Sequence, residues 1–349
     1  TWGTNSITID SNGLNYQGDD DSFDVEYTTD GQSVQIVYAD ATKGWVPIND
    51  DAATDVPEQP GNDNGVFAYG YSGSIVSMKN LVSNSGVVAS DVTGVGTARY
   101  DLAATQYGGD KGIFAYGNTG AVSSLSNLVN NSGTIASDVS GVGTARESPA
   151  ACSYGGTAGG DKGIFAFGVN AAGDKVGLSN LVSNSGVVAS DVSAVGTARR
   201  LLAACEYGDD KGIFAYGDTG SVSTLSNLVS NVGVIASDVS GVGTARKQLA
   251  ACSYGGDKGI FAYGSTGSNV STSNLVSNSG VVGSDVSGVG TARHELAACE
   301  YGKDKAIFAY GYTSDRVSLS NLVNNSGVIA SDVTGVGTAR NVVGGCSYN

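Results

Sequence analysis

The chain has few of the residues on which most catalytic and metal sites depend. It contains a single histidine, His294, and has no Cys-x-x-Cys or His-x-x-x-His spacing, so neither a metal site nor a cofactor is predicted. His294 is the only residue that could supply the histidine of a Ser-His-Asp triad. A carboxylate pair for glycoside hydrolysis stays open, because Glu147, Glu206, Glu295 and Glu300 are available.

Long apolar runs and positive charge are also scarce. No stretch of 18 apolar residues occurs, so membrane insertion is not expected. The 18 Lys and Arg residues are outnumbered by 33 Asp and Glu residues, which gives a net charge of −15. An acidic surface repels phosphate backbones, and nucleic acid is therefore excluded as a partner.

Proline is rare and glycine is abundant, with 4 and 53 residues respectively among 349. This balance is typical of many tight turns. Glycine interrupts the sequence about every ten residues, and no helical period survives, which favours short strands over helices.

A repeated phrase organises the sequence from residue 61 to residue 349. Gly-Thr-Ala-Arg occurs six times, mostly at intervals of 47 residues. It is followed by a small-residue run such as Leu-Ala-Ala-Cys, by Ile-Phe-Ala-Tyr-Gly, and by Leu-Ser-Asn-Leu-Val. One interval is 53 residues long because of insertions near 157–160 and 169–175. Repeats of this length indicate a propeller or a solenoid.

Each repeat is predicted to contain four short strands, which in the last full copy span 296–301, 306–310, 317–323 and 327–333. The first copy lacks the first of these strands, and the chain ends with such a strand at 342–348. A strand supplied by the opposite end closes a ring. The sequence therefore predicts an all-β fold, a six-bladed β-propeller at 61–349 preceded by a small β module at 1–60.

The repeat resembles the kelch type of propeller. An Arg before the first strand and an aromatic-glycine ending to the second match that family, whereas its Gly-Gly doublet is reduced to one Gly and its Trp is missing. The resemblance implies the propeller fold and says little about function.

Residues 1–60 lie outside the repeat and are predicted to hold strands at 6–10, 22–28 and 33–38. The last two are expected to form a hairpin through Thr29–Gly31, and 50–60 is expected to be an acidic linker. The segment 35–47 and the repeat phrase resemble virion structural proteins of marine tailed phages. That resemblance implies a fibre, collar or display component at the virion surface, docked through residues 1–60 to other virion proteins. No coiled-coil heptad sets a number of copies, so a homo-oligomer stays open.

Several residues recur in one slot of every copy and are interpreted as structural. The five cysteines occupy a slot that Thr105 fills in the remaining copy, which indicates buried packing. Two aspartate sets are more typical of turns than of calcium sites. The arginines of Gly-Thr-Ala-Arg could bind an anion at the mouth of the central channel of the propeller. Their identity in all copies favours instead a structural ring of Arg99, Arg146, Arg199, Arg246, Arg293 and Arg340.

The positions that differ between copies favour recognition. They follow Gly-Thr-Ala-Arg and Phe-Ala-Tyr-Gly, and in a four-stranded unit both places lie at the same end. The candidates for contact with a host-surface glycan or protein are Tyr71, Tyr100, Arg200, Lys247, His294, Tyr312 and Arg316. The expected function is non-enzymatic display of the propeller on a virion. A decoration protein without a ligand and a secreted carbohydrate-active enzyme are the alternatives.

Overall fold

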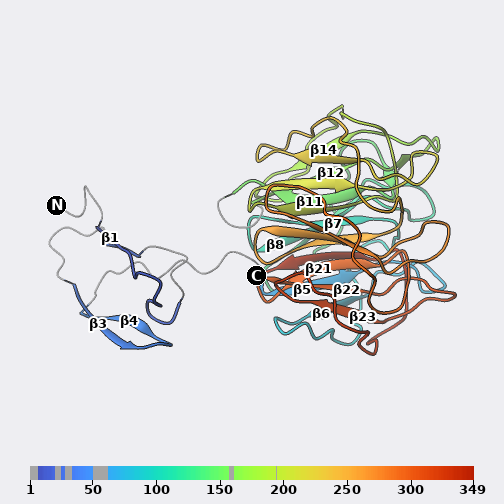
Figure 1. Ribbon diagram of the computed structural model, residues 1–349. Helices are drawn as coiled ribbons and strands as arrows, with labels where there is room; N and C mark the ends of the chain where they lie inside the picture. Colours follow the sequence, from blue (N-terminus) through green and yellow to red (C-terminus); the bar gives the residue numbers. More distant parts are fainter. Residues whose placement is uncertain (1–6, 20–24, 28–33, 50–61, 157–160, 194) are drawn as a thin grey trace. The chain divides into compact units, whose positions relative to one another are not determined.

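The computed structural model describes residues 7–19, 25–27, 34–49, 62–156, 161–193 and 195–349, and the chain divides into two compact units, Thr1–Gln59 and Pro60–Asn349 (Figure 1). The described residues form strands and turns without any helix, which confirms the expected all-β class. Among these residues, accordingly, no helix has the length and apolar character needed to cross a bilayer.

The first unit contains two separate two-stranded antiparallel sheets. β1 (Ile7–Ile9) pairs with β2 (Val25–Tyr27), and β3 (Gln35–Asp40) pairs with β4 (Gly44–Asn49). The predicted pairing of 22–28 with 33–38 is therefore wrong, and its turn at 29–31 and the linker at 50–60 lie outside the described residues. The side chain of Asp40 accepts hydrogen bonds from the amides of Thr42 and Lys43, and this turn joins β3 to β4 instead.

The second unit contains six three-stranded antiparallel sheets in its described part, numbered here in chain order of their central strands. Sheets 1 to 3 are formed by β24 (Gly344–Tyr348), β5 (Asn64–Ala68) and β6 (Lys79–Val82); by β7 (Ala103–Tyr107), β8 (Lys111–Ala115) and β9 (Ser126–Val129); and by β11 (Ala150–Tyr154), β12 (Lys162–Ala166) and β14 (Ser179–Val182). Sheets 4 to 6 are formed by β15 (Ala203–Tyr207), β16 (Lys211–Ala215) and β17 (Ser226–Val229); by β18 (Ala250–Tyr254), β19 (Lys258–Ala262) and β20 (Ser273–Val276); and by β21 (Ala297–Tyr301), β22 (Lys305–Ala309) and β23 (Ser320–Val323).

The fourth predicted strand of each repeat is reduced to two isolated bridges. In sheet 6, Val323 pairs with Ile329 and Ser320 with Val333, but no continuous ladder follows. Between these two bridges the carbonyl of Ala330 accepts from the Asn321 side chain and the Asp332 carboxylate accepts from Thr291, so side-chain contacts replace a continuous ladder. The outer edge of each sheet is thus an irregular segment with exposed valines, such as Val87 and Val92.

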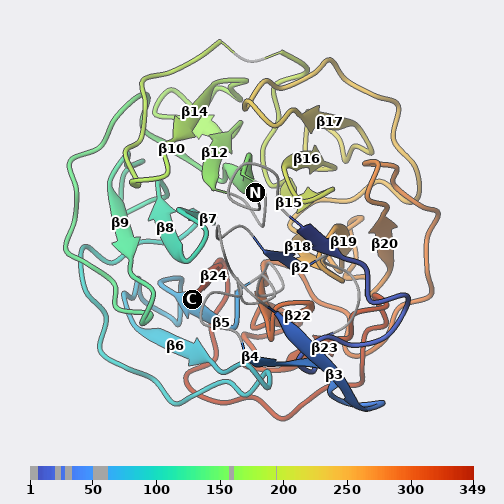
Figure 2. The same ribbon diagram turned by 90° about the vertical axis from the view of Figure 1, so that its left-hand side faces the viewer.

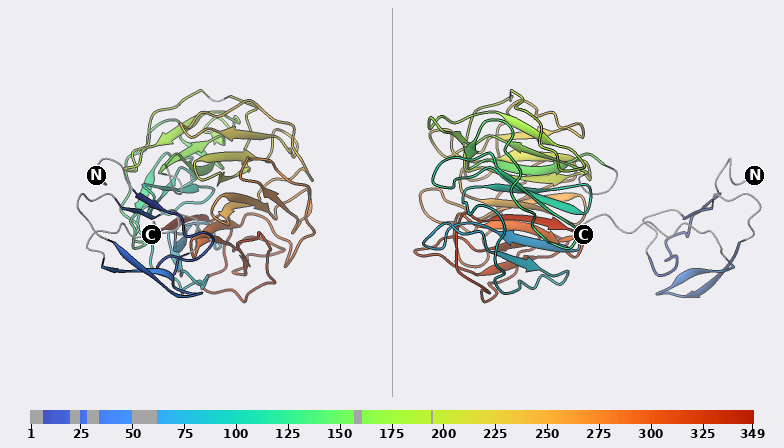
Figure 3. Two further views of the ribbon diagram at one scale, coloured as in Figure 1. Left: turned by 60° about the vertical axis from the view of Figure 1, so that its left-hand side comes forward. Right: turned by 180° about the vertical axis from the view of Figure 1, so that it is seen from behind.

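The sheets follow one another around a common centre. Figure 2 shows β6, β9, β14, β17, β20 and β23 toward the periphery. The innermost strands contact one another in the cyclic order β24, β7, β11, β15, β18, β21 and back to β24. Figure 3 shows the same sheets from two further directions, with turns at the ends of their strands. The C-terminal strand β24 pairs with β5 over its whole length, from Gly344 opposite Ala68 to Tyr348 opposite Asn64. The split copy of the repeat is therefore completed by the C-terminus.

The core lies between neighbouring sheets. Phe67, Ile113, Phe114 and their equivalents in the central strands are fully buried, as the nearly continuous apolar runs predict. Each cysteine is free and buried, which confirms its packing role. A Cβ placed on Gly212 would lie 2.4 Å from the Sγ atom of Cys152, so glycine in β16 makes room for the thiol of the sheet before it.

Candidate functional site

The Gly-Thr-Ala-Arg phrase forms the junction between successive sheets. The Arg99 guanidinium is fully buried and lies over the Tyr69 ring of sheet 1, with its carbon 4.3 Å from the ring centroid. On its other side it donates hydrogen bonds to the carbonyls of Thr97 and Phe114, the latter in sheet 2. The remaining junctions have the same arrangement, and their arginines lie over Tyr116, Phe167, Tyr216, Tyr263 and Tyr310.

An aspartate clamp accompanies each buried arginine. The amide and hydroxyl of Thr97 both donate to the Asp138 carboxylate, and Asn127 donates to it as well. Burial by itself raises the pKa of Asp138, but the hydrogen bonds from Thr97 and Asn127 and the nearby Arg99 outweigh it and hold the pKa below its usual value. The same set is found at Asp91, Asp191, Asp238, Asp285 and Asp332.

The junction between the two ends of the repeat region has the arrangement of the other five with one difference: the Nη1 atom of Arg340 forms no hydrogen bond and lies 3.6 Å from the Asp91 carboxylate. Thr338 donates to Asp91 through its amide and hydroxyl, across 247 residues of sequence. Arg340 lies over Tyr310 of sheet 6 and donates to Asn80 of sheet 1. These buried arginines are not open to a ligand, so the anion site considered for them does not exist.

The second aspartate set lies in the turns between the first and second strands of the sheets, called here the uniform end. Its carbonyls link neighbouring turns: Gly108 donates to Asp161, Gly302 to Asp63 and Asn349 to Asp110, and the other turns do the same. The side chains of Asp257 and Asp304 pair with the adjacent lysines at 2.6 Å. In the described ranges no group of three or more His, Cys, Asp or Glu side chains is arranged to hold a metal ion.

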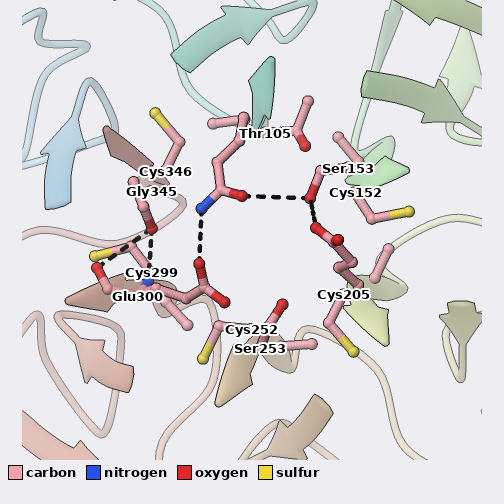
Figure 4. A pocket seen from close by; sticks show the side chains of 18 residues that line it. Thr105, Cys152, Ser153, Cys205, Cys252, Ser253, Cys299, Glu300, Gly345 and Cys346 are labelled. Atoms are coloured by element: carbon pink, nitrogen blue, oxygen red, sulfur yellow. Dashed lines mark hydrogen bonds between the residues drawn. The ribbon is translucent and has the colours of Figure 1, made fainter. Parts of the chain in front are cut away.

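The innermost strands enclose a small cavity with a polar ring. Its lining includes one polar residue from each sheet: Gln106, Ser153, Glu206, Ser253, Glu300 and Ser347. Figure 4 shows Ser153, Ser253 and Glu300 around this cavity. Gln106 donates to Glu300 at 2.8 Å across the cavity, and Ser153 donates to Glu206. Burial raises the pKa of Glu300, although the hydrogen bond from Gln106 opposes this. The cavity volume of about 50 Å³ leaves room for only a few water molecules, so it does not admit a sugar.

The opposite end of the innermost strands carries the variable positions and is called here the variable end. The residue after Gly-Thr-Ala-Arg and the residue after the aromatic-glycine ending form a bridge in every repeat. The bridges are Tyr71–Asn341, Tyr100–Asn118, Glu147–Val169, Arg200–Asp218, Lys247–Ser265 and His294–Tyr312. The structure therefore brings the two variable positions of each repeat together, and all seven candidate side chains of this end are half-buried.

The candidate residues are not distributed evenly around the variable end. Tyr100 and Tyr71 meet edge to face at 6.1 Å, and the Arg316 guanidinium lies over the Tyr71 ring at 4.6 Å. Arg316 forms a bridge with Tyr312, whose ring lies 5.5 Å from that of His294. These five residues form a continuous row across sheets 2, 1 and 6, called here the aromatic row. Lys247 and Arg200 lie apart from it, and Lys247 is paired with Asp218 at 3.0 Å.

A second pocket opens at the mouth of the ring at the variable end. Its polar lining is Asp101, Ser148, Gln248 and Glu295, above a layer of Leu, Pro and Val side chains. Burial, together with the charges of Glu295 and Glu147, raises the pKa of Asp101 to about 7. The sequence did not single out Asp101, because only the fold places three carboxyl groups near one another here.

The mouth also has an unusual backbone. Six non-glycine residues there have positive φ, between 49° and 57°: Asp101, Ser148, Leu201, Gln248, Glu295 and Val342. Val342 is β-branched, a type that rarely adopts this conformation. Consecutive members are joined by backbone hydrogen bonds, such as Ser148 to Asp101 at 2.8 Å and Val342 to Glu295 at 2.9 Å. The ring of sheets holds these residues in a strained conformation.

Comparison of the chain with protein-family models gives no match, and comparison with curated proteins gives none.

Replacing Arg246 with Ala is expected to lower the free energy of unfolding by about 3 kcal/mol, because it removes a desolvated cation from the Tyr216 ring and from Asp285. Urea unfolding measures the change. The matched control is Lys211→Ala, whose ammonium group is exposed at the uniform end and which should change stability by less than about 0.5 kcal/mol. Equal effects of the two substitutions would contradict the structural role of the arginine.

The clamp aspartates predict loss of stability in acid. An unfolded aspartate has a pKa of about 3.9, and the folded value is lower, so stabilisation is complete well above this pH and is lost as the pH falls through the folded pKa. Asp238→Asn should be less stable than the parent chain at pH 7 and should lose less stability between pH 7 and pH 3. Asp315→Asn, at an exposed carboxylate, serves as the control. An unchanged pH dependence in Asp238→Asn would rule out the clamp as its source.

Proposed function

We propose that residues 62–349 form a closed six-bladed β-propeller of kelch-like type, in which each of the six sheets is one blade. Three cyclic sets of contacts support this proposal. They are the innermost strands, the turn-to-turn hydrogen bonds of the uniform end, and the arginine and aspartate junctions. Each set includes the step from sheet 6 back to sheet 1.

The proposed function of this propeller is non-enzymatic recognition through its variable end. The supporting observation is that each bridge at this end joins two residues that differ from copy to copy, on a frame whose junctions are the same in every copy. Variable side chains on a rigid scaffold are typical of binding surfaces. The uniform end, by contrast, repeats one Asp-Lys turn in most copies.

The biological setting proposed for the chain is the surface of a virion. The resemblance of residues 35–47 and of the repeat phrase to phage structural proteins supports it. In this proposal residues 1–60 dock to other virion proteins, and the variable end contacts a host-surface glycan or protein. Gold-labelled antibody against the chain should decorate phage particles, and labelling that is absent from all particles would reject the setting without affecting the recognition function.

A hydrolase is the second candidate, and the raised pKa of Asp101 beside Glu147 and Glu295 is the observation that favours it. The side-chain amides that bind these glutamates argue against a hydrolase. Gln248 and Asn341 donate to the two oxygens of Glu295, and Asn118 donates to Glu147. Carboxylates occupied in this way are poorly placed to act as a nucleophile or a base, and binding is therefore preferred over catalysis.

Replacing Tyr71 and Tyr312 with Ala tests recognition directly. The full chain, presented in multivalent form, is expected to bind intact host cells or a glycan array, and the double variant should bind at least about tenfold more weakly because aromatic contacts contribute strongly at binding surfaces. Lys211→Ala combined with Lys258→Ala, at the uniform end, is the matched control and should bind as the parent chain does. Absence of binding by the multivalent parent chain, or full binding by the double tyrosine variant, would reject the function.

A further inference from the structure

The basic residues that are not buried in the junctions are divided between the two ends, with six at the uniform end, Lys303 among them, and four at the variable end. Of the 18 Lys and Arg residues, six are the buried junction arginines and five are the lysines that follow aspartate in the turns of the uniform end. Seven remain, and four of these, Lys175, Arg200, Lys247 and Arg316, are at the variable end. A chain with a net charge of −15 repels anions over most of its surface, and the five Asp-Lys lysines of the uniform end pair with the adjacent aspartates, so an anionic ligand needs a local cation that is held only weakly by a carboxylate.

Arg316 is the cation within the aromatic row that is available to a ligand. Lys175 and Lys247 share the carboxylate of Asp218, at 3.9 Å and 3.0 Å. The ion-pair partner of Arg316 is Asp315, whose side chain is 87 % exposed and 3.9 Å away. An exposed pair of this kind contributes little stability and is readily displaced by a competing anion.

The orientation of Arg316 suits a carboxylate. Its guanidinium lies over the face of Tyr71, and stacking uses the face of the planar group and not its N–H donors, of which the buried Nε forms no hydrogen bond. Such a stacked group is compatible with two parallel hydrogen bonds to a carboxylate. A lysine in this place would act only as a point charge. The contact with Tyr71 also joins sheet 6 to sheet 1, so the guanidinium is held by the frame and loses less freedom on binding.

The residues on both sides of Arg316 suit the ring of a sugar. Tyr71 and Tyr100 on one side and Tyr312 and His294 on the other are partly exposed rings with polar tips. Such rings pack against the apolar face of a pyranose while their hydroxyl and imidazole groups form hydrogen bonds with sugar hydroxyls. The Nδ1 atom of His294 is fixed by the Asn269 side chain at 2.6 Å, which orients the ring.

We propose that the aromatic row binds a carboxylated saccharide, with the sugar carboxylate held by Arg316 and the pyranose rings packed along Tyr71, Tyr100, Tyr312 and His294. This proposal rests on the recognition function of the variable end and names its ligand class. It differs from a neutral-glycan or protein site in requiring Arg316.

A glycan array with paired carboxylated and neutral sugars, uronates and sialosides among the former, tests the ligand class with the full chain. We expect carboxylated members to be bound in preference to their neutral counterparts, with binding weakened as salt is raised. Arg316→Gln should lower the affinity for the bound carboxylated members by about tenfold or more. Arg316→Lys should restore it only in part, because the two parallel hydrogen bonds are lost.

The matched control is Lys258→Gln, which removes one positive charge at the uniform end and should leave affinity unchanged. Circular dichroism and unfolding curves of the Arg316 variants establish that the fold is retained. Binding restricted to neutral glycans, or equal affinity of Arg316→Gln and the parent chain, would overturn the carboxylate proposal while leaving recognition in place. Binding to cells without any glycan signal would overturn the saccharide, and binding to neither would reject the recognition function as well.

Discussion

The structure depends on one interaction that occurs six times: a buried guanidinium held between the aromatic ring of one sheet and the carbonyls of the next. A buried charge is costly unless it is paired, and at Arg246 the carbonyls of Thr244, Phe261 and Tyr263 and the nearby Asp285 supply that pairing. The backbone of the aromatic residue beneath each arginine lies in the left-handed region, with φ of 65° at Tyr216 and 64° at Tyr263. This conformation is unusual for an aromatic residue. Stacking of the arginine on these rings offsets that strain.

The six junctions share one arrangement, with Phe167 in place of tyrosine at one of them. Each junction uses the same few residue types, whereas the residues that bridge at the variable end differ from repeat to repeat. This division separates the frame, which repeats, from the surface, which does not. The aromatic row illustrates this division. Its residues come from three neighbouring sheets, so the row does not recur in each repeat.

Much of this arrangement was predictable from the sequence, and the exceptions have physical causes. The all-β class, the pairing of the last strand with the first central strand and the buried cysteines followed from the period and from Gly-Thr-Ala-Arg. The fourth strand of each repeat is reduced to isolated bridges, because side chains such as Asn321 and Thr291 bind the polar groups between them. The hairpin predicted around Thr29–Gly31 was wrong, because the turn capped by Asp40 directs β3 to β4. The contact of Arg316 with Tyr71 and the raised pKa of Asp101 depend on residues far apart in sequence, and only the contacts between neighbouring sheets bring them together.

The central claim is that the junction between the two ends of the repeat region is as firm as the other five. Hydrogen exchange of backbone amides, resolved by NMR, measures this directly. The amide of Thr338, which donates to Asp91 across the closure, should be protected to the same degree as those of Thr97, Thr144, Thr197, Thr244 and Thr291. Exchange of Thr338 much faster than that of the other five would contradict the account, because the ring would then open at its ends while the other junctions stay formed.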